Sequence, residues 1–287
     1  MKYRFSKTKV DFRKLNLYSN FFSQCYDRSR HLTPGYLKWL YEENPSGQVI
    51  GFDAFFSEDL AAHYVCIPVN FYFNGNETKG LLSLNTATHP DHQRKGLFVE
   101  IAQKTYQHAK KNGFEFIIGV ANSQSSYGFV KKLGFQLVKP LDVKIGIGLP
   151  KKSAIDKSYY QMHRVWTREL LTWRCNNPSK TYQFNKISKD RIVIHTNTGI
   201  AGIKAILYDS ESYGLNDKSK TNKLNFNPLR IWIGIDPLRK WNHTFYFNLP
   251  DTLRFSPLNL IFKDLTGQNR LLSSEKINFT GFDFDAY

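Results

Sequence analysis

The hydrophobic pattern is clearest between residues 78 and 113, where a strand pattern passes through a short polar turn into a helical one. Residues 78–86 read as a strand, and a short polar segment follows. Apolar positions then recur at the spacing of an amphipathic helix, at Phe98, Ile101, Ala102, Thr105 and Ala109. Two lysines and Asn112-Gly113 are typical of a helix end. The pattern predicts strand, polar turn and helix in succession.

The flanking residues predict further elements of both kinds. Asp11 and Thr33-Pro34 are helix-start signals, and the first helix is expected to bury Phe12 and Leu15 on its apolar side. Three strands are predicted at Val49–Phe56, Ala61–Phe73 and Thr78–Thr86, with Asn74-Gly75 as a hairpin turn. After the central helix we expect a buried strand at 114–120, a helix from Tyr127 to Leu133, and short strands at 136–138 and 143–147.

The second half of the chain repeats part of this pattern. The segment from Leu171 through Trp173 to Pro178-Ser179 echoes the segment from Leu37 through Trp39 to Pro45-Ser46, with one residue fewer between Trp and Pro. Strand patterns follow both copies, and a repeat at domain length indicates duplication. Further strands are predicted at 230–235, 244–247, 258–264 and 282–287.

Composition narrows the class of protein. The 287 residues carry 40 Lys and Arg against 24 Asp and Glu, a net charge of +16, which predicts an anionic ligand. The charges are spread along the chain without a basic tract, so we expect no nucleic-acid partner. The three cysteines are far apart in the sequence, and no metal-ligand spacing is present. The sequence shows no apolar leader and no long apolar run. These features predict a cytoplasmic protein without metal or membrane association.

The polar turn has the chemistry of a phosphate site. Backbone N–H groups at a helix N-terminus, beside Arg94 and Lys95, favour a pyrophosphate, and Gly96 allows close approach. No G-x-G-x-x-G follows a strand, and there is no Walker lysine motif, so a dinucleotide fold and a P-loop are disfavoured.

The motif Gln93-Arg94-Lys95-Gly96-Leu97-Phe98 resembles the Q/R-x-x-G-x-G/A signature of the GNAT acyltransferases, although Phe98 replaces the final small residue. The resemblance extends over residues 81–137. It implies an α/β (α+β) GNAT fold, with a mixed, mostly antiparallel twisted sheet flanked by helices, in residues 1–150. Residues 151–287 are expected to form a second GNAT-like lobe at the acceptor site or interface. This lobe is expected to be degenerate, because Asp209-Ser210-Glu211-Ser212 stands where its phosphate turn would be.

The resemblance also implies which residues bind acyl-coenzyme A, the donor substrate. They are Thr86, Thr88, Gln93, Arg94, Lys95, Gly96, Leu97, Phe98, Asn122 and Ser125.

Direct attack of an amine on the thioester, without a covalent enzyme intermediate, requires a neutral amine, an oxyanion donor and a proton for the leaving thiolate. Asn85 and Thr86 are implicated near the acyl group. Val130 occupies the position where many family members carry a tyrosine acid, so Tyr127 is a substitute or a packing residue. Among Asp53, His63 and Asn85 none is compelling as a base, and positioning is expected to supply most of the rate.

The acceptor is predicted by analogy alone. Paired GNAT-like lobes with this Trp and Asn-Pro pattern are similar to bacterial enzymes that acylate nucleotide-linked (dTDP or UDP) amino deoxysugars for surface polysaccharides such as O-antigen and capsule. The net charge and the 15% aromatic residues agree with such a ligand. Aminoglycoside or protein amines are the alternative acceptors, and a coenzyme-binding module without catalysis is the alternative class.

Overall fold

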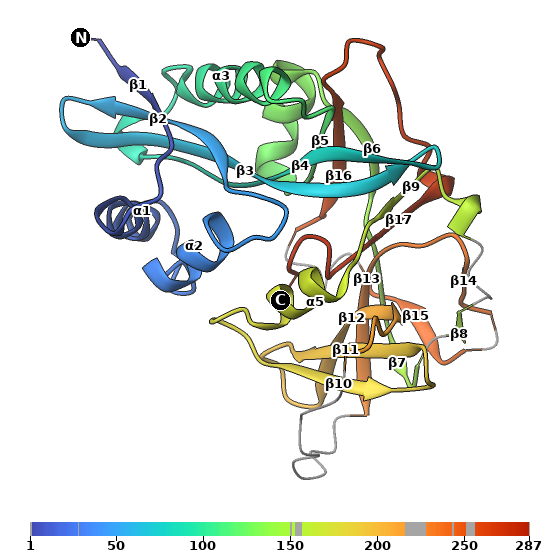
Figure 1. Cartoon of the computed structure of the whole chain (residues 1–287). Helices are drawn as coiled ribbons and strands as arrows, with labels where there is room; N and C mark the ends of the chain where they lie inside the picture. The colour runs from blue at the N-terminus through green and yellow to red at the C-terminus, as the bar shows by residue number, and fades with distance from the viewer. Residues whose placement is uncertain are drawn as a thin grey trace.

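The computed structural model describes residues 2–27, 29–149, 151–152, 157–215, 228–242, 244–250 and 256–286. Figure 1 shows two lobes, an upper one built mainly from the N-terminal half and a lower one built mainly from the C-terminal half. One continuous sheet runs through both lobes. It has the strand order β10-β11-β12-β13-β17-β9-β3-β4-β5-β16-β6.

Two predicted helices open the first lobe. α1 (Phe12–Cys25) begins at Asp11, whose side chain accepts a hydrogen bond from the Lys14 backbone N–H. α2 (Pro34–Tyr41) begins at Thr33 in the same way. Leu15 and Tyr18 are buried as expected, but Phe12 is 80% exposed, because the first residue of the helix lies beyond the edge of the core.

The first lobe's sheet starts with an antiparallel set. β1 (Arg4–Lys7) pairs with β2 (Ile50–Phe56), β2 with β3 (Asp59–Phe73), and β3 with β4 (Asn76–Thr88) around the predicted Asn74-Gly75 turn. β5 (Phe116–Ala121) then runs parallel to β4. The helices α1 and α2 cover one face of this sheet, and α3 (Leu97–Lys111) covers the other.

The helix predicted over 127–133 differs in form. The chain forms the short helix α4 (Ser123–Tyr127), capped by Asn122 and Ser125, and continues as a π-helix, η2 (Gly128–Lys132). A π turn carries one residue more per hydrogen-bonded ring than an α turn, which shifts side-chain directions relative to the predicted helix.

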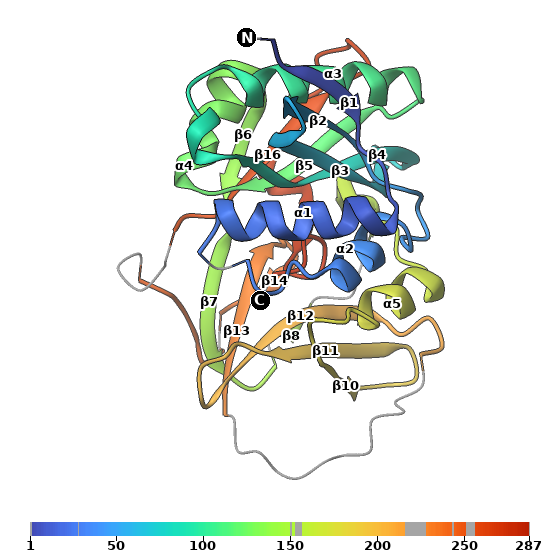
Figure 2. The same ribbon diagram turned by 90° about the vertical axis from the view of Figure 1, so that its left-hand side faces the viewer.

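The lobes exchange one strand in each direction. β7 (Asp142–Ile147), expected to finish the first lobe, instead pairs with β13 (Leu229–Ile235) and β15 (Tyr246–Asn248) of the second. β16 (Asn259–Asp264), from near the C-terminus, lies between β5 and β6 (Gln136–Pro140) of the first lobe. Figure 2 shows green β7 beside orange β13. The division of the chain at residue 150 stays a prediction, and this exchange crosses it.

The second lobe repeats the ladder of the first. After α5 (Arg168–Cys175), three antiparallel strands follow, β10 (Tyr182–Lys186), β11 (Arg191–Asn197) and β12 (Ile203–Glu211), and β13 runs parallel to β12. This order matches α2, β2, β3, β4 and β5. The fold is therefore a GNAT-type sheet followed by a GNAT-like second lobe.

Short elements connect the two ladders. β9 (Met162–Arg164) pairs with β3, and β17 (Ile277–Thr280) joins β9 to β13. The remaining elements are β8 (Lys151–Lys152), β14 (Arg239–Lys240) and the 3-10 turns Pro90–His92, Lys157–Tyr159 and Ser274–Lys276. The strand predicted over 282–287 is not formed in residues 282–286, where turns pack Phe282 into the core, and Tyr287 lies outside the described residues.

The sequence echo becomes a reciprocal contact between α2 and α5. The Trp39 indole N–H donates to the Trp173 carbonyl at 2.9 Å, and the Trp173 indole N–H donates to the Trp39 carbonyl at 3.0 Å. Their rings stack with centroids 4.8 Å apart. The side chains of Asn44 and Asn177 each accept a bond from the backbone N–H two residues on. This two-fold relation supports duplication of the lobe.

Candidate functional site

The polar turn after β4 has the backbone conformation of an anion-binding loop. Arg94 and Gly96 both have positive φ, 60° and 80°, and Gly96 is the N-cap of α3. The Gln93 side-chain amide donates to the Thr88 carbonyl at 3.4 Å, and the Lys95 ammonium donates to the Asp91 carbonyl at 2.9 Å. The first contact ties the turn to the end of β4, and the second closes the turn on itself.

The amides of residues 94–98 are available for a ligand. Among the residues that the structure describes, none of these N–H groups has a hydrogen-bond acceptor, whereas the next two amides of α3 bond to the Gly96 carbonyl. A Cβ added at Gly96 would meet nothing within 4 Å, so open space lies in front of the turn. The positive end of the helix dipole and the exposed Arg94 and Lys95 favour an anion there.

Leu97 and Phe98 can contribute only backbone groups to this turn. Leu97 is 2% exposed, and its side chain packs in the core beneath α3. The Phe98 ring packs against Phe129 at 5.2 Å between centroids, and a Cβ on Gly128 would approach it to 2.9 Å. The glycine in η2 therefore makes room for the ring that replaces the small residue, and the ring turns inward, away from the turn.

The end of β4 separates from β5. Their pairing runs from Gly80 to Ser83 on β4 and stops there. Beyond this point the register with β3 shifts, and Asn85 has a positive φ of 46°. Asparagine tolerates this conformation at a cost of about 1 kcal/mol. The end of β4, which leads into the polar turn, is therefore not paired with β5.

A buried hydrogen-bonded chain ends at Asn85. Asp53 and His63 are 1% and 0% exposed, and the His63 Nδ1 lies 2.7 Å from the Asp53 carboxylate. His63 Nε2 lies 3.1 Å from the Tyr41 hydroxyl, which accepts a bond from the Asn85 side-chain amide at 2.9 Å. An ionised carboxylate only accepts, so Nδ1 donates to Asp53 and Nε2 accepts from Tyr41.

This chain fixes the orientation of the Asn85 amide. Because its nitrogen donates to Tyr41, its oxygen is the free end, and no partner for that oxygen occurs among the described residues. Burial raises the pKa of Tyr41 well above its ordinary value of 10.0, so the phenol stays protonated. His63 is enclosed and fully bonded, so it acts on its surroundings through Tyr41.

Two other tyrosines that the sequence did not single out also lie at the site. The Tyr18 hydroxyl donates to Asp53 at 2.7 Å, and the Tyr26 hydroxyl donates to the Thr86 carbonyl. Tyr18 lies on α1, Tyr26 directly after α1, and Tyr41 on α2. A hydroxyl-bearing ring on the apolar side of a predicted helix was the available signal for Tyr18 and Tyr41, because a buried hydroxyl needs a partner.

α4 carries the remaining predicted residues. Asn122 and Ser125 cap the helix reciprocally, with the Ser125 N–H donating to Asn122 Oδ1 at 2.9 Å. Tyr127 is 65% exposed at the end of α4, while Val130 packs toward the core beneath α3. Thr88 contributes its carbonyl to the turn.

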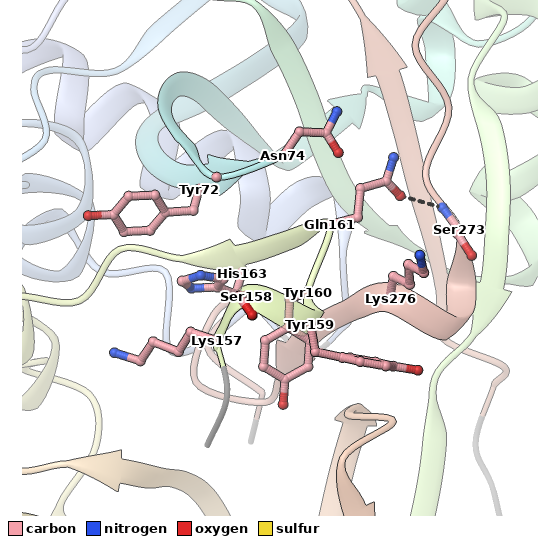
Figure 3. Close-up of a pocket in the computed structure, with 11 residues that line it drawn as sticks. Tyr72, Asn74, Lys157, Ser158, Tyr159, Tyr160, Gln161, His163, Ser273 and Lys276 are labelled. Carbon is pink, nitrogen blue, oxygen red and sulfur yellow. Dashed lines mark hydrogen bonds between the residues drawn. The ribbon is translucent and has the colours of Figure 1, made fainter. Parts of the chain in front are cut away.

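A hollow of about 810 Å³ lies elsewhere. Tyr72, Asn74, Tyr159, His163 and Lys276 are among its lining residues, as Figure 3 shows. It surrounds the β3–β4 hairpin, roughly 30 Å along β4 from the splayed end at about 3.3 Å per residue. It shares no residue with the predicted donor site.

Three further findings bear on the sequence-based expectations. Within the described ranges, no group of three or more His, Cys, Asp or Glu side chains is arranged to hold a metal ion. In the same residues, none of the helices has both the length and the apolar character needed to cross a bilayer. Cys25, Cys66 and Cys175 are free thiols.

The end of β12 in the second lobe corresponds to the end of β4 and carries a buried carboxylate held in ion pairs. Asp209 is buried and accepts two bonds from Arg191 and one from Arg239, at 2.7 to 3.0 Å. The acidic residue that was expected to repel a pyrophosphate is thus neutralised by ion pairs inside the lobe, and a described phosphate-type turn is found only after β4.

Comparison with known proteins agrees with this geometry. Residues 13–138 match the family model described as an acetyltransferase (GNAT) domain. No curated protein sequence matches the chain.

Three solved structures are similar in fold. They are a protein of unknown function from Enterococcus faecalis V583 described as a probable N-acyltransferase, a GCN5-related N-acetyltransferase from Anabaena variabilis, and Eis1 from Mycobacterium abscessus. Their TM-scores are 0.60, 0.58 and 0.54, at 12%, 13% and 8% identity. The matches cover 92%, 92% and 91% of this chain and 73%, 73% and 74% of theirs.

Proposed function

We propose that this chain, whose residues 13–138 match the model of the GNAT acetyltransferase domain, transfers the acyl group of acyl-coenzyme A to the amino group of a nucleotide-linked amino deoxysugar. The enzyme class, an acyl-transferring GNAT enzyme, follows from the family. The acceptor, the residues of the site and a role in bacterial surface polysaccharide synthesis are the proposal.

The single observation that carries the donor site is the turn from Gln93 to Phe98. Five consecutive outward amides, a positive helix end and two exposed cations make a site for a pyrophosphate. The splayed edge of β4 begins beside it. A donor bound by its pyrophosphate can therefore lay its pantetheine arm along the open edge and bring its thioester to Asn85 and Thr86.

The proposed reaction is direct. A neutral amine nitrogen attacks the thioester carbon and the N–C bond forms. The C–S bond then breaks, the nitrogen gives up one proton to solvent, and the leaving thiolate takes one proton. Backbone N–H groups on the open edge of β4 can stabilise the oxyanion, because no partner strand occupies them. Tyr127, exposed at the end of α4, is the side chain proposed to deliver the proton to sulfur.

Asn85 is proposed to position the amine. Its oxygen is the free end of the chain that runs through Tyr41 and His63 to Asp53, so it can accept a hydrogen bond from the amine N–H. Positioning of this kind lowers the barrier without a dedicated base, since well-oriented reactants gain about 7–11 kcal/mol over free ones. His63, enclosed behind Tyr41, is proposed as a positioning residue.

The nucleotide-linked acceptor is supported by charge and composition. A nucleotide sugar brings a second pyrophosphate, which suits a chain of net charge +16, and its base and sugar faces can stack on aromatic side chains. Aminoglycosides and protein amines are cationic, and a strongly basic chain attracts them less.

Titration calorimetry with acetyl-coenzyme A tests the donor site, using a matched pair of glycine variants. Gly96 and Gly113 lie at opposite ends of α3, with φ of 80° and 79° and open space in front of both. Gly96→Ala is expected to weaken coenzyme binding at least tenfold, whereas Gly113→Ala carries the same backbone strain and leaves it unchanged. Equal effects of the two variants would remove the turn from the binding site.

A panel of amines tests the acceptor. Thiol release and product mass are measured with dTDP- and UDP-linked amino sugars, an aminoglycoside and a lysine peptide. Turnover is expected only with the nucleotide sugars. Turnover of the aminoglycoside or the peptide alone would reassign the acceptor, and donor binding without turnover of any amine would identify a binding module.

A further inference from the structure

An apolar cavity of about 440 Å³ lies between the lobes. Its walls come from the β6–β7 connection, from β12 and β13, and from the C-terminal segment. The main apolar residues are Leu141, Val143, Ile203, Ile231, Ile233 and Phe284. The volume falls in the range of ligand sites, about 300–1,000 Å³. A cavity of this chemistry binds apolar groups in preference to water.

The polar groups on its wall are already satisfied. Asp285 accepts bonds from Tyr182 at 2.9 Å and Asn177 at 3.0 Å, and Lys180 lies 3.2 Å from its carboxylate. The Thr198 hydroxyl donates to the Ile203 carbonyl, and the Ser256 hydroxyl donates to that of Ser123. Among the described residues of its wall, the charged group is paired, so these residues favour an apolar occupant.

The cavity wall adjoins the end of β5 and the start of α4. Leu258 on its wall precedes β16, whose residue Asn259 pairs with Ala121 at the end of β5. Ser256 accepts a bond from the backbone N–H of Ser123, the first residue of α4. Leu258 belongs to the same hydrophobic core as Leu84 and Tyr41, on the face opposite α3.

The cavity is thus close to the splayed end of β4. β16 lies next to β5 in the sheet, two strands from β4, so the wall at Leu258 adjoins the strand from which β4 separates. A chain attached to the thioester carbon can extend across the end of β5 into the cavity, while the amine approaches Asn85 beside α1 and α2.

We propose that this cavity holds the hydrocarbon chain of the acyl donor, so that the transferred group is a medium-length acyl chain and not only acetyl. A water molecule takes up about 30 Å³ in the liquid and a methylene is of similar size, so the cavity has room for a chain of roughly ten such groups. The inference rests on the proposed acyl-coenzyme A function and names the class of its donor.

Calorimetry with coenzyme A, acetyl-coenzyme A and octanoyl-coenzyme A tests the inference separately from the function. Octanoyl-coenzyme A is expected to bind at least tenfold more tightly than acetyl-coenzyme A, because the added methylenes leave water. If all three bind with equal affinity, the cavity is not an acyl site although the enzyme function stands. If none binds, both proposals fail.

Filling the cavity supplies the second test. Ile233→Trp places a large ring in the cavity and is expected to abolish the preference for octanoyl-coenzyme A while leaving acetyl-coenzyme A binding unchanged. Ile200→Trp, at the exposed rim of the cavity, serves if Ile233→Trp does not fold as judged by thermal unfolding. Leu137→Trp, on an exposed position of β6 outside the cavity, is the size-matched control.

A preference that survives both cavity variants would overturn the proposal. The proposal would also be overturned if the cavity variants lost turnover with apolar acceptors while their donor preference stayed unchanged. That result would assign the cavity to the acceptor.

Discussion

The two lobes share the same order of one helix and four strands. They differ at the end of the third strand, which is β4 in the first lobe and β12 in the second. In the first lobe, β4 ends in a bulge, a splayed edge and a turn whose amides face outward. In the second lobe, β12 ends in a buried carboxylate held by two arginines. The difference shows that the sheet survives loss of the site, because strand pairing depends on backbone and core residues, while the site depends on a few residues after one strand.

The second strand of each set, β3 in the first lobe and β11 in the second, carries a buried histidine. The two histidines differ in their hydrogen bonding. His63 on β3 is bonded at both ring nitrogens, to Asp53 and Tyr41. His195 on β11 is 2% exposed, and neither of its ring nitrogens has a partner among the described residues. In the first lobe the histidine is part of an ordered polar chain, and in the second it is a buried neutral group without a hydrogen-bond partner among the described residues.

Acid should therefore destabilise the second lobe first. Burial, then Arg230 and Lys204, lower the pKa of His195 to about 4. In the unfolded chain the pKa of this histidine is about 6.5. As the pH falls below that value, only the unfolded chain takes up the proton, so the free energy of unfolding falls by up to about 3 kcal/mol by pH 4.

Urea unfolding at pH 7 and pH 4.5 measures the loss. His195→Leu is expected to lose less stability than wild type between the two values, with the part-exposed His89→Gln as control. An equal loss in His195→Leu and wild type would show that this group does not carry the acid sensitivity.

Breaking the polar chain of the first lobe should reduce turnover. Tyr41→Phe removes the hydroxyl between His63 and Asn85, which frees the Asn85 amide to rotate. Turnover is expected to fall about a hundredfold, equivalent to about 2.7 kcal/mol, with the coenzyme affinity unchanged. Tyr106→Phe, which also removes a buried hydroxyl but on the α3 side, is the control. Similar turnover in both variants would contradict a positioning role for Asn85.

The reciprocal tryptophans offer a test of the two-fold relation. Trp39→Phe and Trp173→Phe each remove one indole N–H and with it one of the two hydrogen bonds between α2 and α5. Each is expected to lower the free energy of unfolding by about 2 kcal/mol. Because the two rings form one contact, the double variant should lose less than the sum, and a double-mutant cycle measures the difference. Strict additivity would mean that the contacts are independent.

The smallest effect is expected at the proposed acid. A coenzyme A thiol is a weak base near neutral pH, so Tyr127→Phe should lower turnover by less than about tenfold. Single-turnover kinetics with the purified variant would detect it. A loss beyond about a thousandfold with binding intact, in Tyr127→Phe and in His63→Asn, would refute the idea that positioning supplies most of the rate.

Local signals in the sequence predicted local structure well. The caps at Asp11, Thr33 and Asn122, the hairpin at Asn74-Gly75 and the turn before α3 all depend on residues within a few positions of one another. The fold is of the GNAT type, and residues 13–138 match the model of the GNAT acetyltransferase domain.

Long-range pairing was beyond the reach of these signals. The strand pattern at 258–264 was predicted, but nothing in it specifies β5 and β6 as partners, since strands of similar pattern are interchangeable until the whole sheet is assembled. The contact between Tyr41 and Asn85 spans 44 positions, so the chain that positions Asn85 emerged only from the fold.

The exchange of β7 and β16 has a consequence for synthesis of the protein. A nascent chain on the ribosome displays β5 and β6 with open edges until residue 264 has emerged, and its β7 waits for β13 until residue 235 has emerged. The first lobe is thus completed by a segment from the second half of the chain, and the two lobes cannot mature one after the other.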